Sequence, residues 1–512
     1  MRTDSIADLL RHQAARQSAR QGLIEPARTW SHAELDEATS RVANGLLAAG
    51  VGRGDTVACL TKSLTACLLL AVGAAKCAAV SVPLNWRLKA AEIDYAIRLV
   101  RPKVLVIDGS FAPIAAELAL HERMLLLYVD GDAAATDFTA WWATQPAGDP
   151  AASVAPTDVA FRMFSSGTTG RPKAVSVTHE GVLAHVRSWT GPFGMREDDT
   201  VHLNVLPTFH VSGLVNALWV LGIGGTVVTR AQFDPADFLA SIARYRVTDT
   251  FVVPTMLGAL IASPAYATTD LSSLRCIAYG GSPIALELLS KCVRTLPCDL
   301  RQVYGMTESS GCISLLQPED HRRGIDEPGI LRAAGRPAPH VEIRIVDPRG
   351  GGDCADGQVG EIWVRSSQNF DGYHEDPAAT SQTFPEGRPG WYRTGDAGYR
   401  GDGLLYVSDR IKDMIITGGE NVYPVEVEQI LATHPAVRDV AVIGVPDATW
   451  GESVRACVVL RPGVSASAEE LIAYTREQIA HYKCPKSVLL VEEIPRNASG
   501  KILKTVLREK YA

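Results

Sequence analysis

The sequence predicts an α/β protein built from a large N-terminal domain of layered α/β subdomains with a small β-barrel-like subdomain, followed by a small α+β C-terminal domain. Up to about residue 250, helix-like segments alternate with short Val/Ile/Leu runs, which is the pattern of parallel β–α layers. From about residue 335 to 408, short strand-like runs alternate with Gly-rich turns, which is typical of a small antiparallel barrel or sheet. The chain has 512 residues, too many for one core, because domains usually run about 100–200 residues.

The N-terminal part is expected to alternate helices and strands. Residues 1–17 have helical periodicity, and the apolar run Thr65–Ala75 predicts a buried helix that leads into a strand at Ala79–Pro83. Further strands are predicted at Val104–Ile107, Leu125–Val129, Gly225–Thr229, Thr250–Val253 and Ser273–Tyr279, and a helix at Ile284–Arg294.

The remaining elements form two groups. The barrel or sheet is predicted from the runs Val341–Val346, Gly360–Val364 and Gly403–Val407. In the last hundred residues, Pro424 marks a helix start, and Ser467 with Glu470 forms a capping box. This C-terminal unit is completed by the predicted strands Asp439–Val445, Val454–Leu460 and Val488–Ile494 and the helix Leu471–Ile479.

Composition excludes several classes of protein. Lys plus Arg number 50 and Asp plus Glu 57, a net charge of -7 without a basic run, which disfavours a nucleic-acid partner and an anionic membrane surface. The most apolar run is too short to span a bilayer, and the N-terminus lacks the apolar region of a signal peptide. The 10 cysteines are scattered without a CxxC pair, so we expect a reduced, cytoplasmic protein without disulfides, a zinc site or integral membrane contact.

The segment Phe164–Lys173 predicts a phosphate-binding loop. Six small residues, Ser165–Gly170, precede the cation Lys173, so backbone and hydroxyl groups are available to wrap an oligophosphate while the lysine supplies charge. The segment does not match the GxxxxGK[ST] pattern, because Lys173 follows Arg171-Pro172 and no Ser or Thr comes next. A flexible linker is the alternative, and the apolar runs on both sides disfavour it.

Further motifs follow this loop in a fixed order. With it, they resemble the acyl-activating superfamily of acyl-CoA synthetases, firefly luciferase and peptide-synthetase adenylation domains, over nearly the whole chain. The phrases DMIITGGENVYP and IPRNASGKILKTVLRE most resemble bacterial fatty-acid or specialised-acid CoA ligases. The motifs are Leu206–His210, Tyr279–Pro283, Tyr304–Glu308, Tyr392–Asp396, Asp409–Asp413, Gly418–Asn421 and Pro495–Lys501.

The resemblance implies an AMP-forming acid–thiol ligase that uses ATP, Mg²⁺ and coenzyme A. A small-molecule carboxylate attacks the α-phosphate of ATP, pyrophosphate leaves, and a thiol then displaces AMP from the acyl-adenylate. One alternative is an adenylating ligase that loads a carrier protein, and another is a catalytically silent homologue that only binds an acyl group or nucleotide. The intact charged residues of the motifs argue against the silent homologue.

The resemblance also implies roles for individual residues. Thr307 contacts the α-phosphate, Glu308 binds Mg²⁺ and Lys501 bridges the substrate carboxylate and α-phosphate. Tyr304 stacks on adenine and Asp396 binds the ribose hydroxyls, while His210 lies at the acyl wall for packing or gating rather than as a general base. The implied nucleotide- and CoA-binding residues are Ser165, Ser166, Gly167, Thr168, Thr169, Gly170, Lys173, Gly280, Gly281, Ser282, Tyr304, Asp396, Arg410, Lys412, Gly418, Gly419 and Glu420.

Domain rotation is a further implication of the resemblance. It divides the chain into an adenylation domain (residues 1–408), a hinge (409–413) that contains Lys412, and a mobile C-terminal domain (414–512). Lys501 enters the site for adenylation, and Gly418–Asn421 replaces it for thioester formation. The sequence is silent on oligomeric state, and a homodimer stays one option.

The acid is expected to be apolar. From Val201 to Thr229 there is no Lys, Arg, Asp or Glu, so the region lacks the arginine that pairs with the second carboxylate in relatives handling malonate. The presumed acyl wall, Phe251–Leu257 with Val211–Val215, is apolar. The one departure from the family pattern is Ala174, where glycine is usual; Tyr373 is interpreted as a core or turn residue.

Overall fold

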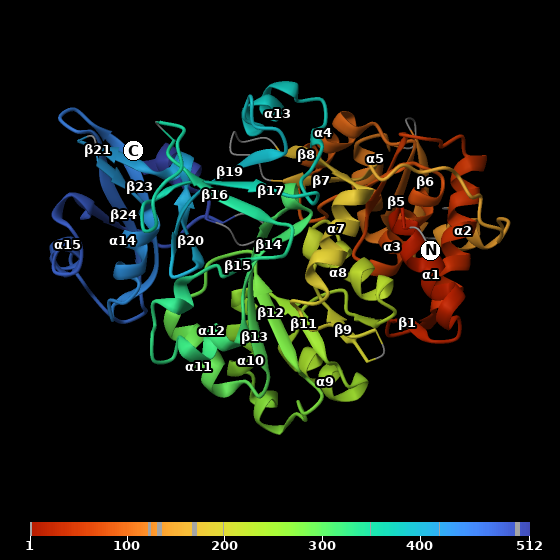
Figure 1. The fold of residues 1–512 in the computed structure, drawn as a ribbon, viewed down its shortest axis with the longest axis horizontal. Helices are drawn as coiled ribbons and strands as arrows, with labels where there is room; N and C mark the ends of the chain where they lie inside the picture. Colours follow the sequence, from red (N-terminus) through yellow and green to blue (C-terminus); the bar gives the residue numbers. More distant parts are fainter. Residues whose placement is uncertain are drawn as a thin grey trace. The chain divides into compact units, whose positions relative to one another are not determined.

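The computed structural model describes residues 3–120, 124–130, 136–165, 172–197, 199–348, 350–418, 420–496 and 502–511. Its contacts divide the chain into two compact units (Figure 1). The first unit contains Met1–Glu342 and Val364–Tyr392, and the second contains Ile343–Trp363 and Arg393–Ala512. The prediction of a mixed α/β protein with a large N-terminal and a small C-terminal part is confirmed.

One large sheet of the first unit has nine strands in the order β15-β14-β13-β12-β11-β9-β10-β1-β2. The strands from β1 across to β13 are parallel, and β2, β14 and β15 are added antiparallel at the edges. The strands are β1 (Gln21–Ile24), β2 (Thr29–Ser31), β9 (Val201–Asn204), β10 (Thr226–Thr229), β11 (Asp249–Val252), β12 (Cys276–Gly280), β13 (Asp299–Met306), β14 (Gly311–Leu316) and β15 (Arg336–Pro337).

A second sheet of this unit has seven strands in the order β18-β8-β7-β4-β3-β5-β6. Its strands from β7 to β6 are parallel, whereas β8 and β18 continue the sheet antiparallel. The strands are β3 (Thr56–Leu60), β4 (Val80–Pro83), β5 (Val104–Asp108), β6 (Leu125–Val129), β7 (Val159–Ser165), β8 (Lys173–Thr178) and β18 (Gly372–Tyr373).

Helices cover these sheets, as the alternating pattern predicts. α3 is buried on every side, which explains why its sequence is apolar throughout rather than amphipathic. The helices are α1 (Ile6–Gln17), α2 (His32–Ala48), α3 (Leu64–Lys76), α4 (Ala90–Val100), α5 (Ala112–Glu117), α6 (Phe138–Ala143), α7 (His179–Trp189), α8 (Val211–Gly222), α9 (Pro235–Tyr245), α10 (Pro254–Ala262), α11 (Leu286–Thr295), α12 (Pro318–Arg323) and α13 (Pro377–Thr383).

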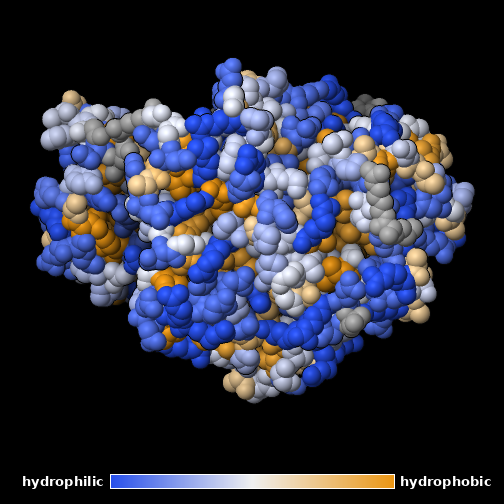
Figure 2. All heavy atoms as spheres, viewed as in Figure 1, coloured by the Kyte–Doolittle hydropathy of each residue, from blue (hydrophilic) through white to orange (hydrophobic). Residues whose placement is uncertain are grey.

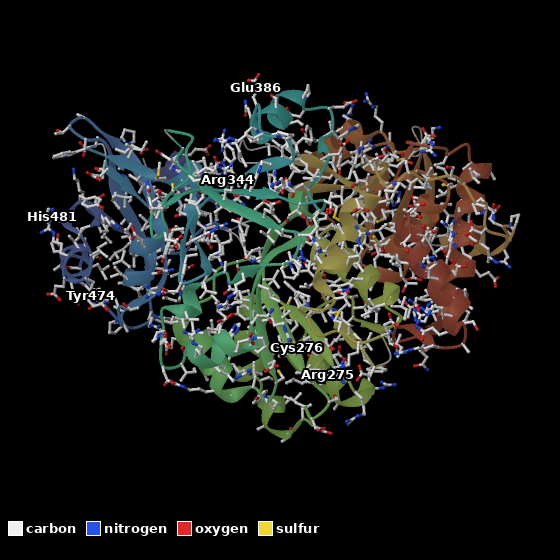
Figure 3. The ribbon with its side chains drawn as sticks, in the orientation of Figure 1. Arg275, Cys276, Arg344, Glu386, Tyr474 and His481 are labelled. Atoms are coloured by element: carbon white, nitrogen blue, oxygen red, sulfur yellow. The ribbon has the colours of Figure 1, made fainter. Side chains whose placement is uncertain are left out.

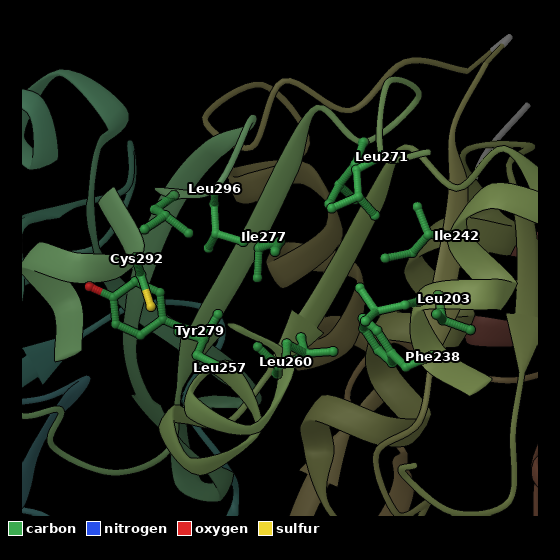
Figure 4. Close-up of a cluster of buried hydrophobic side chains, with 14 of the residues drawn as sticks. Leu203, Phe238, Ile242, Leu257, Leu260, Leu271, Ile277, Tyr279, Cys292 and Leu296 are labelled. Atoms are coloured by element: carbon green, nitrogen blue, oxygen red, sulfur yellow. The ribbon is translucent and has the colours of Figure 1, made fainter. Parts of the chain in front are cut away.

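The core between the nine-stranded sheet and helices α9 to α11 is apolar and well packed (Figure 4). Leu203 and Ile277 from the strands meet Phe238 and Ile242 from α9 and Leu257 from α10, and each of these side chains is almost fully buried. Burial of a large apolar side chain contributes about 1.5–3 kcal/mol, so this layer holds the strand ends in fixed positions.

The second unit contains one whole sheet and most of another. Strands β16 (Glu342–Val346), β17 (Gly360–Arg365), β19 (Trp391–Gly401) and β20 (Leu404–Arg410) form a four-stranded sheet in that order. The other sheet has the order β22-β21-β24-β23, with a fifth strand, β25, parallel to β24. Its elements are β21 (Ile415–Thr417), β22 (Glu420–Val422), β23 (Val437–Asp447), β24 (Gly451–Leu460), β25 (Ser487–Leu490), α14 (Pro424–Leu431), α15 (Ala468–Arg476) and α16 (Lys504–Tyr511).

Local signals located most elements to within a few residues. β6 has the predicted bounds, α14 begins at Pro424, and Ser467 caps α15 by accepting the backbone N–H of Glu470 at 3.1 Å. The predicted last strand, by contrast, is too long. It stops at Leu490 because its pairing with β24 ends there, and Ile494 is buried in a separate cluster.

Hydrophilic side chains cover most of the face drawn in Figure 2, with hydrophobic residues in scattered patches. Within the described part of the chain, none of the helices combines the length and the apolar character needed to cross a bilayer.

Candidate active site

The β7–β8 hairpin brings the two ends of the predicted phosphate loop together. Ser165, the last residue of β7, is the cross-strand partner of Lys173, the first residue of β8. Ser166, Gly167, Thr168, Thr169 and Gly170 lie outside the described residues. Ala174, the departure from the family pattern, is buried in the core of the seven-stranded sheet, so its methyl group is accommodated.

Glu308 lies beside this hairpin, in the short 3-10 turn Thr307–Ser309 that follows β13. Its Oε1 accepts one hydrogen bond from the Ser165 hydroxyl and one from the Tyr373 hydroxyl, each at 3.1 Å. Among the described residues, no group donates to its Oε2. Within the described part of the chain, the carboxylate is therefore held through one oxygen only.

This arrangement suits a magnesium ion bound together with nucleotide phosphates. Mg²⁺ prefers oxygen ligands and is usually held by one or two carboxylates plus substrate phosphates rather than by an all-protein cage. In the part of the chain that the structure describes, no group of three or more His, Cys, Asp or Glu side chains forms a cage. Glu308, whose Oε2 has no donor among the described residues, fits the mode in which a carboxylate shares the ion with substrate phosphates.

The turn that carries Glu308 depends on close backbone packing. Tyr304 and Thr307 are both half-buried, and Tyr304 pairs with Ser314 across the β13–β14 ladder. The ladder shifts register between Tyr304 and Gly305, where a Cβ on Gly305 would lie 2.0 Å from the Gly311 carbonyl oxygen. Only glycine permits this approach, so Gly305 lets the chain turn from Tyr304 towards Thr307 and Glu308.

Gly280 and Gly281 lie at the carboxyl end of β12, the edge of a parallel sheet where ligands usually bind. A Cβ on Gly280 would lie 2.3 Å from the Val303 carbonyl oxygen, and Gly281 has a φ of +84°, whereas the adjacent Ser282 is exposed. The amino end of β12 is occupied differently: Arg275, labelled with Cys276 in Figure 3, pairs with Asp199 at 2.6 Å and Asp249 at 3.3 Å.

His210 immediately precedes α8, and its ring centroid is 4.5 Å from that of Phe209. Both a packing and a gating role are compatible with this contact. In the presumed acyl wall, Val252 and Leu257 are fully buried in the sheet core. Phe251, Val253 and Met256 are only half-buried and remain candidates for contact with the acid.

In the second unit, Asp396 and Arg410 are cross-strand partners on β19 and β20. The Arg410 Nε lies 2.8 Å from the Asp396 Oδ1, and the Asp396 backbone N–H donates to the Thr394 hydroxyl at 3.0 Å. The Asp396 side chain is 8% exposed and the Arg410 side chain 38%, so a buried acid is joined to a partly accessible cation.

The predicted hinge, residues 409–413, is tied to α14 and α16 by ion pairs. Lys504 Nζ lies 2.9 Å from the Glu428 carboxylate and 3.5 Å from that of Asp409, and Arg508 pairs with Asp413 at 2.8 Å. Burial raises the pKa of Glu428 and of Asp409. Burial opposes the charge of Lys504, but the neighbouring Glu428 and Asp409 carboxylates raise its pKa overall.

The remaining predicted residues are also in the second unit. Lys412 is exposed within the 3-10 turn Ile411–Asp413. Gly418 has a φ of +59° and its N–H donates to the Trp450 carbonyl at 2.9 Å; a Cβ there would lie 2.6 Å from the Trp450 ring. Glu420 is exposed at the start of β22. Gly419 and Lys501 lie outside the described residues.

Sequence reasoning missed Tyr373. Its interpretation as a core or turn residue is incomplete, because its hydroxyl contacts Glu308, 65 residues away in the chain. The neighbouring sequence contains no local signal for this contact. The pairing of β18 with β8 creates it.

Comparison with known proteins agrees with the fold. Residues 10–374 match the description "AMP-binding enzyme" and residues 426–501 match "AMP-binding enzyme C-terminal domain". The chain is 35% identical over 515 residues to the long-chain-fatty-acid–CoA ligase FadD13 of Mycobacterium tuberculosis, covering 99% of each chain. It is 34% identical over 490 residues to the fatty acid–[acyl-carrier-protein] ligase ScoC of Streptomyces coeruleorubidus, covering 94% of this chain and 92% of ScoC.

Among solved structures, ATP-bound MatB from Rhodopseudomonas palustris is similar over 99% of both chains, with a TM-score of 0.89 and 29% identity. The fold and the motif residues thus define a nucleotide-dependent ligase. The chain belongs to the AMP-binding enzyme family. It is an AMP-forming acid–thiol ligase, which uses ATP to convert a carboxylic acid to an acyl-adenylate and then transfers the acyl group to CoA.

Proposed function

We propose that the acid is apolar and lies against α8 and the half-buried residues after β11. Residues 201–229 contain no Lys, Arg, Asp or Glu, so nothing in this stretch would pair with a second carboxylate. Phe251 and Val253 are half-buried apolar residues outside the sheet core, and Met256, which packs against that core, is also only half-buried. An aliphatic, alicyclic or aromatic acid fits these surroundings better than a dicarboxylate.

The observation that carries the proposed site is the contact of Ser165 and Tyr373 with one oxygen of Glu308. In the proposed site, Glu308 would hold Mg²⁺, which when bound would supply positive charge to the phosphate oxygens. Thr307 donates its hydroxyl to the α-phosphate, Tyr304 offers its ring to adenine, and Lys173, with the loop that precedes it, neutralises the phosphates.

In this site the substrate carboxylate attacks the α-phosphorus, the bond to the bridging oxygen breaks, and pyrophosphate leaves with that oxygen. Lys501 holds the attacking carboxylate and the α-phosphate in line. Asp396 accepts hydrogen bonds from the ribose hydroxyls while Arg410 orients its carboxylate, which the 2.8 Å ion pair supports. The CoA thiolate then attacks the acyl carbon, and AMP leaves.

We also propose that the segment around Lys412 is a hinge between residues 1–408 and 414–512. Support comes from α16, which Lys504 and Arg508 tie to the hinge residues Asp409 and Asp413, so the segment that contains Lys501 follows any rotation about the hinge. In the thioester-forming state, Gly418–Glu420 takes the place of Lys501 beside the pantetheine arm. Lys412→Pro should slow thioester formation more than adenylation, and equal slowing of both half-reactions would contradict the hinge.

The second candidate acceptor is a carrier protein. ScoC, a fatty acid–[acyl-carrier-protein] ligase that is 34% identical to this chain, favours keeping this alternative. We further propose a cytoplasmic location, which the free thiols of all ten cysteines support, and a homodimer stays a prediction.

The first experiment measures pyrophosphate release with a panel of carboxylic acids, with and without CoA, followed by mass spectrometry of the products. We expect acyl-CoA from apolar acids only. If acyl-adenylate accumulates in the presence of CoA and is consumed when a carrier protein is added, the acceptor is the carrier protein rather than CoA. Preferential turnover of dicarboxylates would overturn the apolar acid site. Glu308→Gln should suppress pyrophosphate release with every acid.

A further inference from the structure

Tyr373 occupies a position that the reaction scheme does not use. Its hydroxyl donates to Glu308 Oε1 at 3.1 Å, the same oxygen that accepts from Ser165. Two donors on one carboxylate oxygen restrict rotation of the carboxylate group and direct the other oxygen, Oε2, away from them. The hydrogen bond from Tyr373 therefore determines which oxygen of Glu308 is directed towards the proposed metal site.

The backbone of Tyr373 is held from two sides. Tyr373 pairs with Val175 in the β18–β8 ladder, and its N–H donates to the Thr380 hydroxyl of α13 at 2.9 Å. The preceding Gly372 has a φ of +134°, a backbone conformation that L side chains rarely adopt. This anchoring gives the Tyr373 hydroxyl a defined position before any ligand binds.

The same segment also holds the backbone of Glu308. The N–H of Phe370 donates to the Glu308 carbonyl oxygen at 2.8 Å, and the Phe370 ring packs edge-on against the Tyr373 ring at 5.0 Å. Residues 370–373 therefore contact Glu308 through both its main chain and its side chain. Such double support is expected for a group that must be preorganised.

The ring of Tyr373 has a second contact. The Lys173 ammonium lies 4.8 Å from the ring centroid, within the range of a cation–π interaction. One side chain thus contacts both the acid proposed to bind the metal and the lysine proposed to bind the phosphates. The hydroxyl serves the first contact and the ring face serves the second, so the two can be separated by mutation.

We propose that Tyr373 is the positioning residue of the metal site: its hydroxyl orients the Glu308 carboxylate so that Oε2 faces the ion, and its ring positions Lys173. This inference rests on the proposed role of Glu308. Outer partners of metal ligands commonly change metal affinity by 10–100-fold when they are removed. For Tyr373→Phe we therefore expect roughly tenfold weaker metal binding, while the Lys173 contact stays.

The test uses the full-length protein with Mn²⁺ as a spectroscopic substitute for Mg²⁺. Mn²⁺ affinity is measured by electron paramagnetic resonance in the presence of α,β-methylene-ATP, which cannot release pyrophosphate, and the melting temperature is recorded for each variant. The matched control is Tyr266→Phe, which removes a hydroxyl that donates to the Thr295 carbonyl at 2.8 Å on an exposed part of the first unit. We expect parental Mn²⁺ affinity for this control.

Further variants separate the two contacts. Ser165→Ala should weaken Mn²⁺ binding in the same direction as Tyr373→Phe. Tyr373→Leu should in addition weaken binding of the nucleotide without metal, because it removes the ring beneath Lys173, and Tyr373→Phe should restore that affinity. Parental Mn²⁺ affinity in Tyr373→Phe would overturn the inference, as would a loss that merely follows a fall in melting temperature.

Glu308→Gln distinguishes this inference from the proposed function beneath it. If Glu308→Gln binds Mn²⁺ as the parent does, the metal-binding role of Glu308 fails and the inference fails with it. If Glu308→Gln loses Mn²⁺ while Tyr373→Phe keeps it, only the positioning role of Tyr373 is wrong.

Discussion

The guanidinium of Arg410 lies 2.8 Å from the carboxylate of Asp396, across the β19–β20 ladder that makes them direct partners. The acid is almost completely buried, while the arginine keeps partial access to solvent. A buried carboxylate held by a charged neighbour keeps a fixed orientation. This is the property that a hydrogen-bond acceptor for two ribose hydroxyls requires.

Asp396→Asn should weaken ATP binding by roughly tenfold or more, because hydrogen bonds to a charged group contribute about 1.5–3 kcal/mol. Isothermal titration calorimetry with ATP measures the change. Arg344→Gln is the matched control, because Arg344, labelled in Figure 3, also pairs with an aspartate of the second unit, Asp353 at 2.6 Å, but this aspartate is exposed. An Asp396→Asn variant that binds ATP like this control would refute the ribose role.

Gly280→Ala should be more destabilising than Gly281→Ala. At Gly280 the new Cβ would lie 2.3 Å from the Val303 carbonyl oxygen, so the β12–β13 backbone must shift, at a cost of about 1–3 kcal/mol or more. At Gly281 the nearest heavy atom to the Cβ is 3.9 Å away, and only the positive φ of +84° opposes alanine, by about 1–2 kcal/mol. Thermal unfolding of the two variants in parallel checks the order, and a lower melting temperature for Gly281→Ala would contradict it.

Lys504→Met should destabilise the second unit by about 3–5 kcal/mol, because it leaves the Glu428 and Asp409 carboxylates buried without their cation. Lys504→Arg keeps the charge and should recover part of the loss. Hydrogen exchange at α14 and α16 reports the effect locally. Unchanged protection of both helices in Lys504→Met would show that the ion pairs contribute little.

The protein should lose stability when the pH falls from 7 to 5. Burial lowers the pKa of His185 to about 4, from about 6.5 for an exposed histidine. His185 is therefore protonated at a lower pH in the folded state than in the unfolded state. The contribution of the neutral ring is fully present above pH 6.5 and is lost as the pH falls towards 4, by about 2 kcal/mol for one such histidine between pH 7 and 5. The same direction and cause apply to His32, His179 and His202.

His185→Phe tests this contribution. Among the described residues neither ring nitrogen of His185 has a hydrogen-bond partner, so a ring without nitrogens should fit the site chemically. We expect the melting temperature of His185→Phe to fall less between pH 7 and pH 5 than that of the parent. His481 is exposed (Figure 3), and His481→Gln should fall as the parent does. Equal falls in all three proteins would exclude a role for His185 in acid sensitivity.

Local patterns in the sequence determined much of the fold. The apolar run of α3, the proline that starts α14 and the serine that caps α15 each depend on residues within a few positions of one another. The motif of small residues before Lys173 likewise needs only a hairpin between β7 and β8 to bring its ends together. Such signals are local, and they are readable because helix and strand periodicity reflects which face of a segment is buried.

Contacts between distant segments were decided only by the tertiary structure. Tyr373 meets Glu308 because β18 adds to the edge of β8, and Lys504 meets Glu428 because α16 and α14 both pack against β23. The burial of Val252 and Leu257 has the same origin, since the helices on the nine-stranded sheet cover them. A one-dimensional pattern states that a residue is apolar or charged, but its partner is chosen by strand order and helix packing, which no local window contains.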